Sequence, residues 1–148
     1  MNIFFDVDQT ILGMDNSLRP GTVTVMSKLI RAGHKLYIWS GAGVRTAVVR
    51  HHDLESLICG IYQKPLYDYH QRLKEFGIPI TPDLVIDDDP AIVRAFGGVY
   101  IPAFYSWDKQ DTGMDRVWRI ISEFVDCGIS KDDRFVLQPS LSELQSEN

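Results

Sequence analysis

Residues 3–10 of the chain, Ile-Phe-Phe-Asp-Val-Asp-Gln-Thr, indicate the fold of the whole domain. A short apolar run that ends at an aspartate is typical of a strand buried on both faces. Such strands belong to parallel sheets, because helices cover both faces of a parallel sheet. The stretch therefore predicts an α/β fold in which acidic side chains follow the carboxyl end of the first strand.

Apolar runs and helical stretches alternate along the rest of the chain. The expected strands are 3–5, 36–39, 57–62, 84–86 and 99–101, and the expected helices are 21–32, 41–50, 65–76, 90–96 and 112–127. Gly33 is suited to end the first helix and Pro90 to begin the fourth. The alternation predicts a three-layer, Rossmann-like sandwich with a five-stranded, mostly parallel sheet.

The chain has 148 residues, which is the usual size of a single domain. We expect a catalytic domain over residues 1–128. The charged, turn-rich residues 129–148 are expected to form a partly flexible C-terminal extension, frayed over 141–148.

Composition excludes several classes of function. The net charge is −5, and binding to nucleic acid requires clustered basic residues. No apolar run approaches the ~20 residues that cross a bilayer. Cys59 and Cys127 lack the spacing of a zinc or redox motif, and the N-terminus lacks the basic start of a signal peptide. We therefore expect a cytoplasmic protein that binds neither nucleic acid nor membrane.

Polar residues follow the ends of the predicted strands. They are Asp6, Asp8, Ser40, Lys64 and the run 87–89. Ligands of parallel α/β sheets bind beyond the carboxyl ends of the strands, close to the point where the strand order reverses. These side chains are therefore expected to meet at one edge of the sheet.

Four carboxylates in one place call for a cation. Two unit charges about 4 Å apart repel by about 4 kcal/mol at an effective dielectric constant of 20. A hard divalent ion relieves this repulsion, and Mg²⁺ is bound in proteins by one or two carboxylates together with waters and phosphate oxygens. Asp6, Asp8, Asp87 and Asp88 are thus candidate metal-site residues.

The remaining polar residues suit an anion. Ser40 and the amide of Gly41 lie at an expected helix start, where backbone amides receive phosphate oxygens. Lys64 precedes a proline, which favours an extended backbone, and its ammonium could neutralise charge on a transferring phosphoryl group. Together with the acidic residues, these groups indicate phosphoryl transfer.

The chain resembles the haloacid dehalogenase-like phosphohydrolases over roughly residues 1–125. Asp6-Val7-Asp8-Gln9-Thr10 resembles their first motif, D-x-D-x-T. Ser40 is similar to the second motif, Lys64 to the third and Val85-Ile86-Asp87-Asp88 to the acidic fourth. All four occur in the order of the family, each after an expected strand.

The resemblance implies a role for each matching residue. Asp6 would be the nucleophile that forms an aspartyl-phosphate, and Asp8 would protonate the leaving group and then activate water. Ser40 and Lys64 would hold the phosphoryl oxygens. Thr10 would support the loop without touching the substrate.

The same resemblance implies a Mg²⁺ cofactor. Its ligands would be the Asp6 carboxylate, the Asp8 backbone carbonyl and a carboxylate of the fourth motif. Asp88 is the first choice there, with Asp87 in support, while Asp89 is suited to cap the helix at Pro90.

The intervals between the motifs leave no room for an inserted cap domain, so we expect a site open to solvent. Two kinds of phosphorylated substrate fit such a site. A phosphoprotein would cover the site itself, whereas a small molecule would need a second copy of the chain to close it.

Two alternatives to a phosphatase use the same fold. A phosphotransferase would pass the phosphoryl group to a hydroxyl instead of water. A catalytically degenerate module would bind phosphate, or signal, without turnover.

Other charged residues are expected to be solvated. Arg45 follows Ser40 closely enough to reach a substrate, but we expect it to face water. Asp108, Asp111 and Asp115 lack the pattern of a calcium loop and are expected to form a solvated acidic patch.

Overall fold

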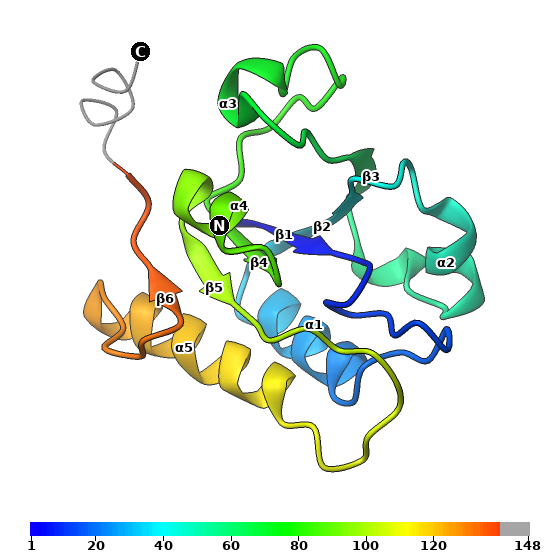
Figure 1. Ribbon diagram of the computed structural model, residues 1–148. Coiled ribbons are helices and arrows are strands. Elements are labelled where there is room, and N and C mark those ends of the chain that lie inside the picture. Colours follow the sequence, from blue (N-terminus) through cyan, green and yellow to red (C-terminus); the bar gives the residue numbers. More distant parts are fainter. Residues whose placement is uncertain (140–148) are drawn as a thin grey trace.

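The computed structural model describes residues 1–139 and contains one six-stranded sheet with helices on both faces (Figure 1). The strands are β1 (Asn2–Asp6), β2 (Lys35–Ser40), β3 (Gly60–Gln63), β4 (Leu84–Asp87), β5 (Gly98–Tyr100) and β6 (Phe135–Val136). They lie in the order β3-β2-β1-β4-β5-β6. All pairs are parallel except β5 with β6. The expected α/β architecture with a mostly parallel sheet is confirmed.

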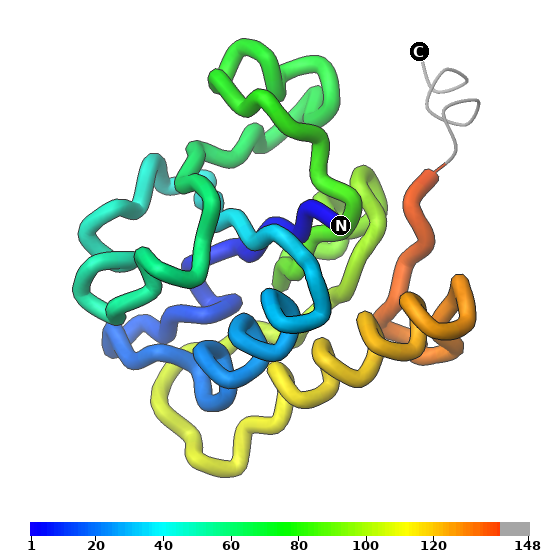
Figure 2. The backbone as a smooth tube through the Cα atoms, turned by 180° about the vertical axis from the view of Figure 1, so that it is seen from behind, coloured from blue at the N-terminus to red at the C-terminus, as the bar shows by residue number. Residues whose placement is uncertain are grey.

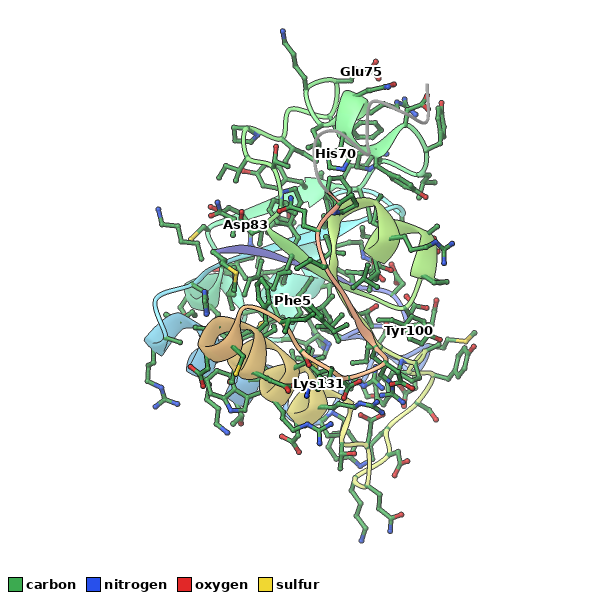
Figure 3. The ribbon with its side chains drawn as sticks, turned by 90° about the vertical axis from the view of Figure 1, so that its left-hand side faces the viewer. Phe5, His70, Glu75, Asp83, Tyr100 and Lys131 are labelled. Carbon is green, nitrogen blue, oxygen red and sulfur yellow. The ribbon has the colours of Figure 1, made fainter. Side chains whose placement is uncertain are left out.

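Five α-helices and one short 3₁₀ helix connect the strands. They are α1 (Thr22–Arg31), α2 (Thr46–His51), η1 (Glu55–Leu57), α3 (Tyr69–Arg72), α4 (Pro90–Phe96) and α5 (Gly113–Cys127). The core on one face of the sheet takes side chains from α1, α2 and α5, and the core on the other face takes them from α4 and the segment after α3. Figure 3 shows this arrangement from the side, with Phe5 labelled on the central strand β1 and His70 on α3.

The central strand β1 explains why both faces must be covered. Ile3 and Phe5 lie in the core beneath α1 and α5, whereas Phe4 lies in the opposite core, and all three are fully buried. Alternate residues of a strand point to opposite faces, so this apolar triplet is stable only between two layers of helices.

The strand order places the polar strand ends next to one another. β1 pairs with β2 on one side and with β4 on the other, so Asp6, Ser40 and Asp87 end three adjacent strands. The chain runs outward from β1 through β2 to β3 and then returns to start β4 beside β1. The strand order therefore reverses between β1 and β4, which is where ligands of such sheets bind.

The expectation of five strands is wrong because the chain after α5 adds a sixth. The backbone N–H of Tyr100 donates to the Arg134 carbonyl at 2.9 Å, and β6 covers the edge of β5. The Asp132 carboxylate also accepts from Arg116 at 2.9 and 2.7 Å and from Arg119 at 3.0 Å, which joins this segment to α5. The fraying expected over 141–148 lies outside the described residues.

Two helices are shorter than the sequence pattern predicts. The helix expected over 41–50 begins at Thr46, because Gly43 has a φ of +115° and the preceding turn folds back on Ser40. The helix expected over 65–76 is α-helical over Tyr69–Arg72, because Asp68 before it has a left-handed φ of 48°. Both unwound segments lie directly after strand ends.

The loops that follow β1 and β5 are tied together (Figure 2). The buried Arg19 guanidinium donates to both oxygens of Asp111 at 2.8 and 3.0 Å and to the Pro102 carbonyl at 2.9 Å. The Met14 N–H also donates to the Tyr105 carbonyl at 2.6 Å. Asp111 is therefore half of a buried ion pair, contrary to the expectation of a solvated patch.

Within residues 1–139, no helix is long and apolar enough to span a membrane.

Candidate active site

Asp6 is held at the end of β1 by two side chains. It is buried, its Oδ1 accepts from Lys64 Nζ at 2.9 Å, and its Oδ2 accepts from Thr10 Oγ1 at 2.8 Å. Residues 7–12 form a tight turn in which three successive N–H groups point to the Val7 carbonyl. This turn carries Thr10 back beneath the strand end, so the D-x-D-x-T spacing produces the contact.

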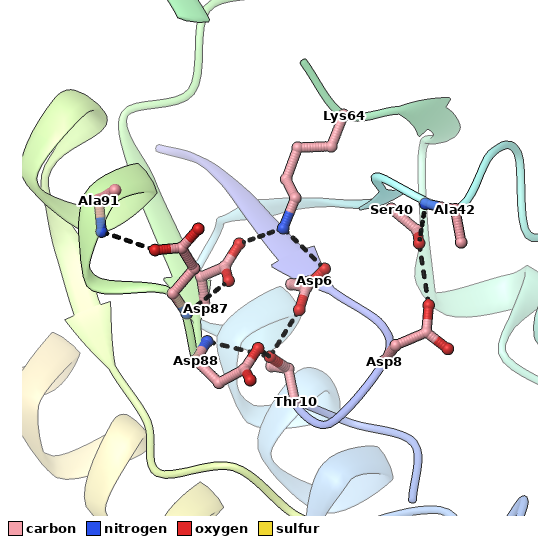
Figure 4. A network of polar contacts seen from close by, with 10 residues as sticks. Asp6, Asp8, Thr10, Ser40, Ala42, Lys64, Asp87, Asp88 and Ala91 are labelled. Carbon is pink, nitrogen blue, oxygen red and sulfur yellow. Dashed lines mark hydrogen bonds and ion pairs between the residues drawn. The ribbon is translucent and has the colours of Figure 1, made fainter. Parts of the chain in front are cut away.

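Lys64 bridges the first and fourth strands. Its Nζ donates to Asp6 Oδ1 at 2.9 Å and to Asp87 Oδ2 at 2.7 Å, and only 9% of its side chain is exposed. The backbone N–H of Lys64 donates to the Ser40 carbonyl at 2.9 Å, which continues the pairing of β3 with β2 past the strand end. Figure 4 shows the lysine reaching between the two carboxylates.

The three consecutive aspartates after β4 have three different positions. Asp87 is fully buried, and its second oxygen accepts from the Asp89 N–H at 2.9 Å. Asp88 is half-buried, and its Oδ1 lies 3.1 Å from the Thr10 hydroxyl that also contacts Asp6. Asp89 caps α4 through the Ala91 N–H at 2.9 Å, as the sequence predicted.

Ser40 and Gly41 form the turn after β2. The Ser40 Oγ accepts from the Ala42 N–H at 3.1 Å and donates to Asp8 Oδ2 at 3.0 Å. A Cβ on Gly41 would lie 2.6 Å from a methyl group of Leu66, so a larger residue there would have to displace the exposed Leu66 side chain. Leu66 thus covers the turn that the sequence assigns to anion binding.

Arg45 contradicts the expectation of a solvated side chain. Its guanidinium lies 3.1 Å from Asp8 Oδ1, and 25% of the arginine side chain and 35% of the aspartate side chain are exposed. The sequence placed Arg45 near the site, but its direction depends on the unwound turn 41–45, which no local pattern indicated. Arg45 is therefore the site residue that sequence reasoning missed.

Burial and mutual repulsion dominate the electrostatics of the acidic groups. Burial, followed by the charge of Asp87, raises the pKa of Asp6 to about 7, although Lys64 and Thr10 act in the opposite direction. Burial likewise raises the pKa of Asp87 to about 6 against the effect of Lys64. Burial alone would lower the pKa of Lys64, but Asp87 and Asp6 outweigh it and the pKa is raised.

The acidic groups form a plausible donor set for a hard cation. One oxygen each from Asp6, Asp87 and Asp88 lies within 4.8 Å of the others, and we call these three residues the acidic cluster. Lys64 is the cation paired with this cluster among residues 1–139, so negative charge is in excess there. Clustered carboxylate oxygens are the ligands that Mg²⁺ and similar ions prefer, and the residues therefore fit a divalent metal.

The site is more enclosed than its sequence suggested. The chain between Asp6 and Lys64 forms α1, β2, α2, η1 and β3, so no cap domain is inserted there. Nevertheless Asp6, Ser40, Lys64 and Asp87 are all buried, and the groups that reach solvent are Asp8, Asp88 and Arg45. The site is therefore open to solvent, as expected, on the side where Asp8, Asp88 and Arg45 lie, and is otherwise enclosed.

The structure thus brings together the sequence-predicted residues in one constellation, and Figure 4 shows them around the ends of β1, β2 and β4. No protein-family model, curated protein or solved structure matches this chain. Any function must therefore be argued from the geometry of the site.

Proposed function

We propose that the protein is a Mg²⁺-dependent phosphohydrolase that cleaves phosphomonoesters through an aspartyl-phosphate intermediate, as its resemblance to haloacid dehalogenase-like enzymes implies. The observation that carries this proposal is the buried contact of Lys64 with Asp6 and Asp87, beside Ser40 and Asp8. A nucleophile, a cation, a hydroxyl and a second carboxylate at one strand edge are the groups that phosphoryl transfer needs.

The acidic cluster supports a divalent cofactor. Asp6, Asp88 and Asp87 would hold Mg²⁺, together with the Asp8 backbone carbonyl. When bound, the ion supplies positive charge that compensates the phosphoryl oxygens and the carboxylates.

The side chains of the site can then perform two balanced steps. In the first, an Asp6 oxygen attacks phosphorus, the bond from phosphorus to the ester oxygen breaks, and Asp8 gives a proton to the departing oxygen. In the second, Asp8 takes a proton from water as that water attacks the aspartyl-phosphate. Inorganic phosphate leaves, and the Asp6 carboxylate and the Asp8 proton are restored.

Ser40 and Lys64 would bind the phosphoryl group during both steps. The Lys64 ammonium already contacts the nucleophile, so a phosphoryl group on Asp6 would lie within its reach. The Ser40 hydroxyl donates to Asp8 and can turn to a phosphoryl oxygen once Asp8 moves. The Gly41 N–H would add a backbone donor, whereas the next two N–H groups of this turn, of Ala42 and Gly43, donate to Ser40 itself.

The test is release of p-nitrophenol and phosphate from p-nitrophenyl phosphate with Mg²⁺ and with a chelator. We expect turnover with Mg²⁺, its loss with the chelator, and a decrease of about 10³-fold or more in Asp6→Asn. Asp126→Asn is a matched control, because Asp126 is exposed near the end of α5. Unchanged turnover in Asp6→Asn would reject the assignment.

The two alternatives predict different outcomes of the same assay. A phosphotransferase would release p-nitrophenol faster than phosphate when an alcohol such as glycerol is added. A phosphate-binding module would be stabilised against heat by Mg²⁺ and phosphate without releasing p-nitrophenol.

A further inference from the structure

The contact between Arg45 and Asp8 lies on the solvent-facing side of the site. Arg45 Nη2 is 3.1 Å from Asp8 Oδ1, and Ser40 Oγ donates to the other Asp8 oxygen at 3.0 Å. Both oxygens of Asp8 are therefore occupied by donors from the turn after β2. In Figure 4 Asp8 and Ser40 lie on the side of Asp6 away from Asp87 and Asp88.

We propose that Arg45 determines substrate specificity by binding a second anionic group, a carboxylate or a phosphate, carried by the leaving group of the phosphomonoester. The inference rests on the proposed function. It narrows the substrate class from phosphomonoesters in general to those whose alcohol is itself negatively charged close to the ester oxygen.

The direction of attack in the proposed reaction would place the leaving group beside Arg45. Attack by Asp6 in line with the breaking bond places the leaving group on the far side of phosphorus, where Asp8 must reach the ester oxygen. A guanidinium in contact with Asp8 therefore lies beside the leaving group. An anionic group one or two bonds beyond the ester oxygen would fall within its reach.

The distribution of charge also favours this role. Lys64 is buried between two carboxylates, and its remaining N–H would serve the phosphoryl group on Asp6 rather than the leaving group. Within residues 1–139, Arg45 supplies the cation paired with Asp8, and a quarter of its side chain is exposed. Guanidinium groups bind carboxylates and phosphates through two parallel hydrogen bonds, which gives them selectivity for such groups.

Binding of the second anion would also free Asp8. The substrate anion would replace Asp8 as the partner of Arg45. The aspartate, no longer held as a carboxylate by the guanidinium, could then take up a proton from water and turn to the ester oxygen. A substrate without a second anion would leave the ion pair in place, and Asp8 would have to leave Arg45 without a replacement partner.

The backbone holds Arg45 in this place. The Ala42 N–H and the Gly43 N–H donate to the hydroxyl and the carbonyl of Ser40 at 3.1 and 3.3 Å, and the Arg45 carbonyl accepts from the Val49 N–H at 3.2 Å. The turn that carries Arg45 is thus fixed to Ser40 at one end and to α2 at the other.

The first experiment compares two substrates of similar size with Mg²⁺. They are 2-phosphoglycolate, whose leaving group carries a carboxylate, and 2-hydroxyethyl phosphate, whose leaving group is neutral. We expect a ratio of kcat/KM that favours 2-phosphoglycolate. In Arg45→Gln this ratio should fall by about tenfold or more, mainly through KM, which is the effect of losing charge-assisted hydrogen bonds. Arg45→Lys should keep part of the ratio.

A matched control is Arg50→Gln, because Arg50 lies on α2, is exposed and pairs with Glu55. The ratio of kcat/KM for the two substrates in Arg50→Gln should equal the ratio in the unchanged protein. If Arg45 only orients Asp8, Arg45→Gln will lower kcat for both substrates equally and leave the ratio as it was. That result would overturn the inference and leave the proposed function intact.

A second experiment measures binding by calorimetry in Asp6→Asn, which cannot form the aspartyl-phosphate. We expect Asp6→Asn to bind 2-phosphoglycolate more tightly than 2-hydroxyethyl phosphate. The double variant with Arg45→Gln should lose this preference. If this preference holds but the unchanged protein has no turnover, the proposed hydrolysis fails, and only the binding of the second anion by Arg45 stands. Equal binding of both compounds in Asp6→Asn overturns the role of Arg45.

Discussion

Two groups of aspartates in this molecule face opposite electrostatic conditions. The acidic cluster at the ends of β1 and β4 has three carboxylates and one contacting lysine. In the second group, which we call the Asp132 group, Asp132 of the chain after α5 lies between the guanidinium groups of Arg116 and Arg119 from the first half of that helix. Negative charge is therefore in excess in the acidic cluster, whereas it is compensated in the Asp132 group.

The pKa values move in opposite directions as a result. In the acidic cluster, burial and repulsion raise the pKa of Asp6 to about 7. In the Asp132 group, the hydrogen bond from Arg116 holds the pKa of Asp132 well below its usual range. Compensated charge joins β6 to α5, whereas the acidic cluster keeps an excess of buried negative charge that a cation could compensate.

The largest difference should follow removal of a cation from each group. Lys64→Met leaves buried carboxylates without a partner, so we expect the free energy of unfolding to fall by about 3–5 kcal/mol at pH 8 with a chelator. Arg119→Met should cost less than about 1 kcal/mol, because 68% of the Arg119 side chain is exposed. Denaturant titration measures both. Equal losses would show that the two groups do not differ as described.

Asp6→Asn should raise the stability of the metal-free protein at pH 8, on the order of 2 kcal/mol. The raised pKa of Asp6 means that its contribution to stability is present at low pH and is lost as the pH rises through about 7. The advantage of the variant should therefore shrink below pH 6. Denaturant titrations at pH 5 and pH 8 test this sign, and a variant less stable at pH 8 would contradict it.

Mg²⁺ should stabilise the unchanged protein and not Asp6→Asn. At ten times its Kd the ion would add about 1.4 kcal/mol. Because protons compete with the ion for Asp6 and Asp87, whose pKa values are raised to about 7 and about 6, the increase in Tm should be larger at pH 8 than at pH 6. Thermal denaturation with MgCl₂ or a chelator measures it. A Tm that Mg²⁺ leaves unchanged at pH 8 would argue against the metal site.

Asp132→Asn should have a small effect, opposite in sign to that of Asp6→Asn. We expect a loss of about 1 kcal/mol at pH 7, since solvent screens the partly exposed arginines. The lowered pKa of Asp132 means that its contribution is present above pH 4 and is lost as the pH falls below that. The Tm difference between the variant and the unchanged protein should thus shrink as the pH falls from 4 toward 2.

The sequence was sufficient to predict the acidic cluster for a physical reason. Each of its residues follows an apolar run that must be buried, so the run fixes the strand and the strand end fixes the polar residue. This holds for Asp6, which follows the apolar run Ile3–Phe5, and for Asp87, which follows Leu84–Ile86. Fully buried parallel strands leave the chain little freedom to place these side chains elsewhere.

The parts that the sequence did not predict depend on contacts between distant segments. β6 has two residues, and its stability comes from β5 and from Asp132 binding α5 rather than from its own pattern. Arg45 points inward because it pairs with Asp8 of another loop, and Asp111 points inward because it pairs with Arg19. Local periodicity carries no information on such pairs.

The antiparallel β6 has a consequence for self-association. It covers β5 with a strand of two residues, so β3 is the longer of the two edge strands of the sheet within residues 1–139. An added chain that extends this sheet through main-chain pairing would then have to align along Gly60–Gln63. The last residue of β3 in such a pairing would be next to Lys64. Addition of chains along β3 would therefore affect access to Lys64.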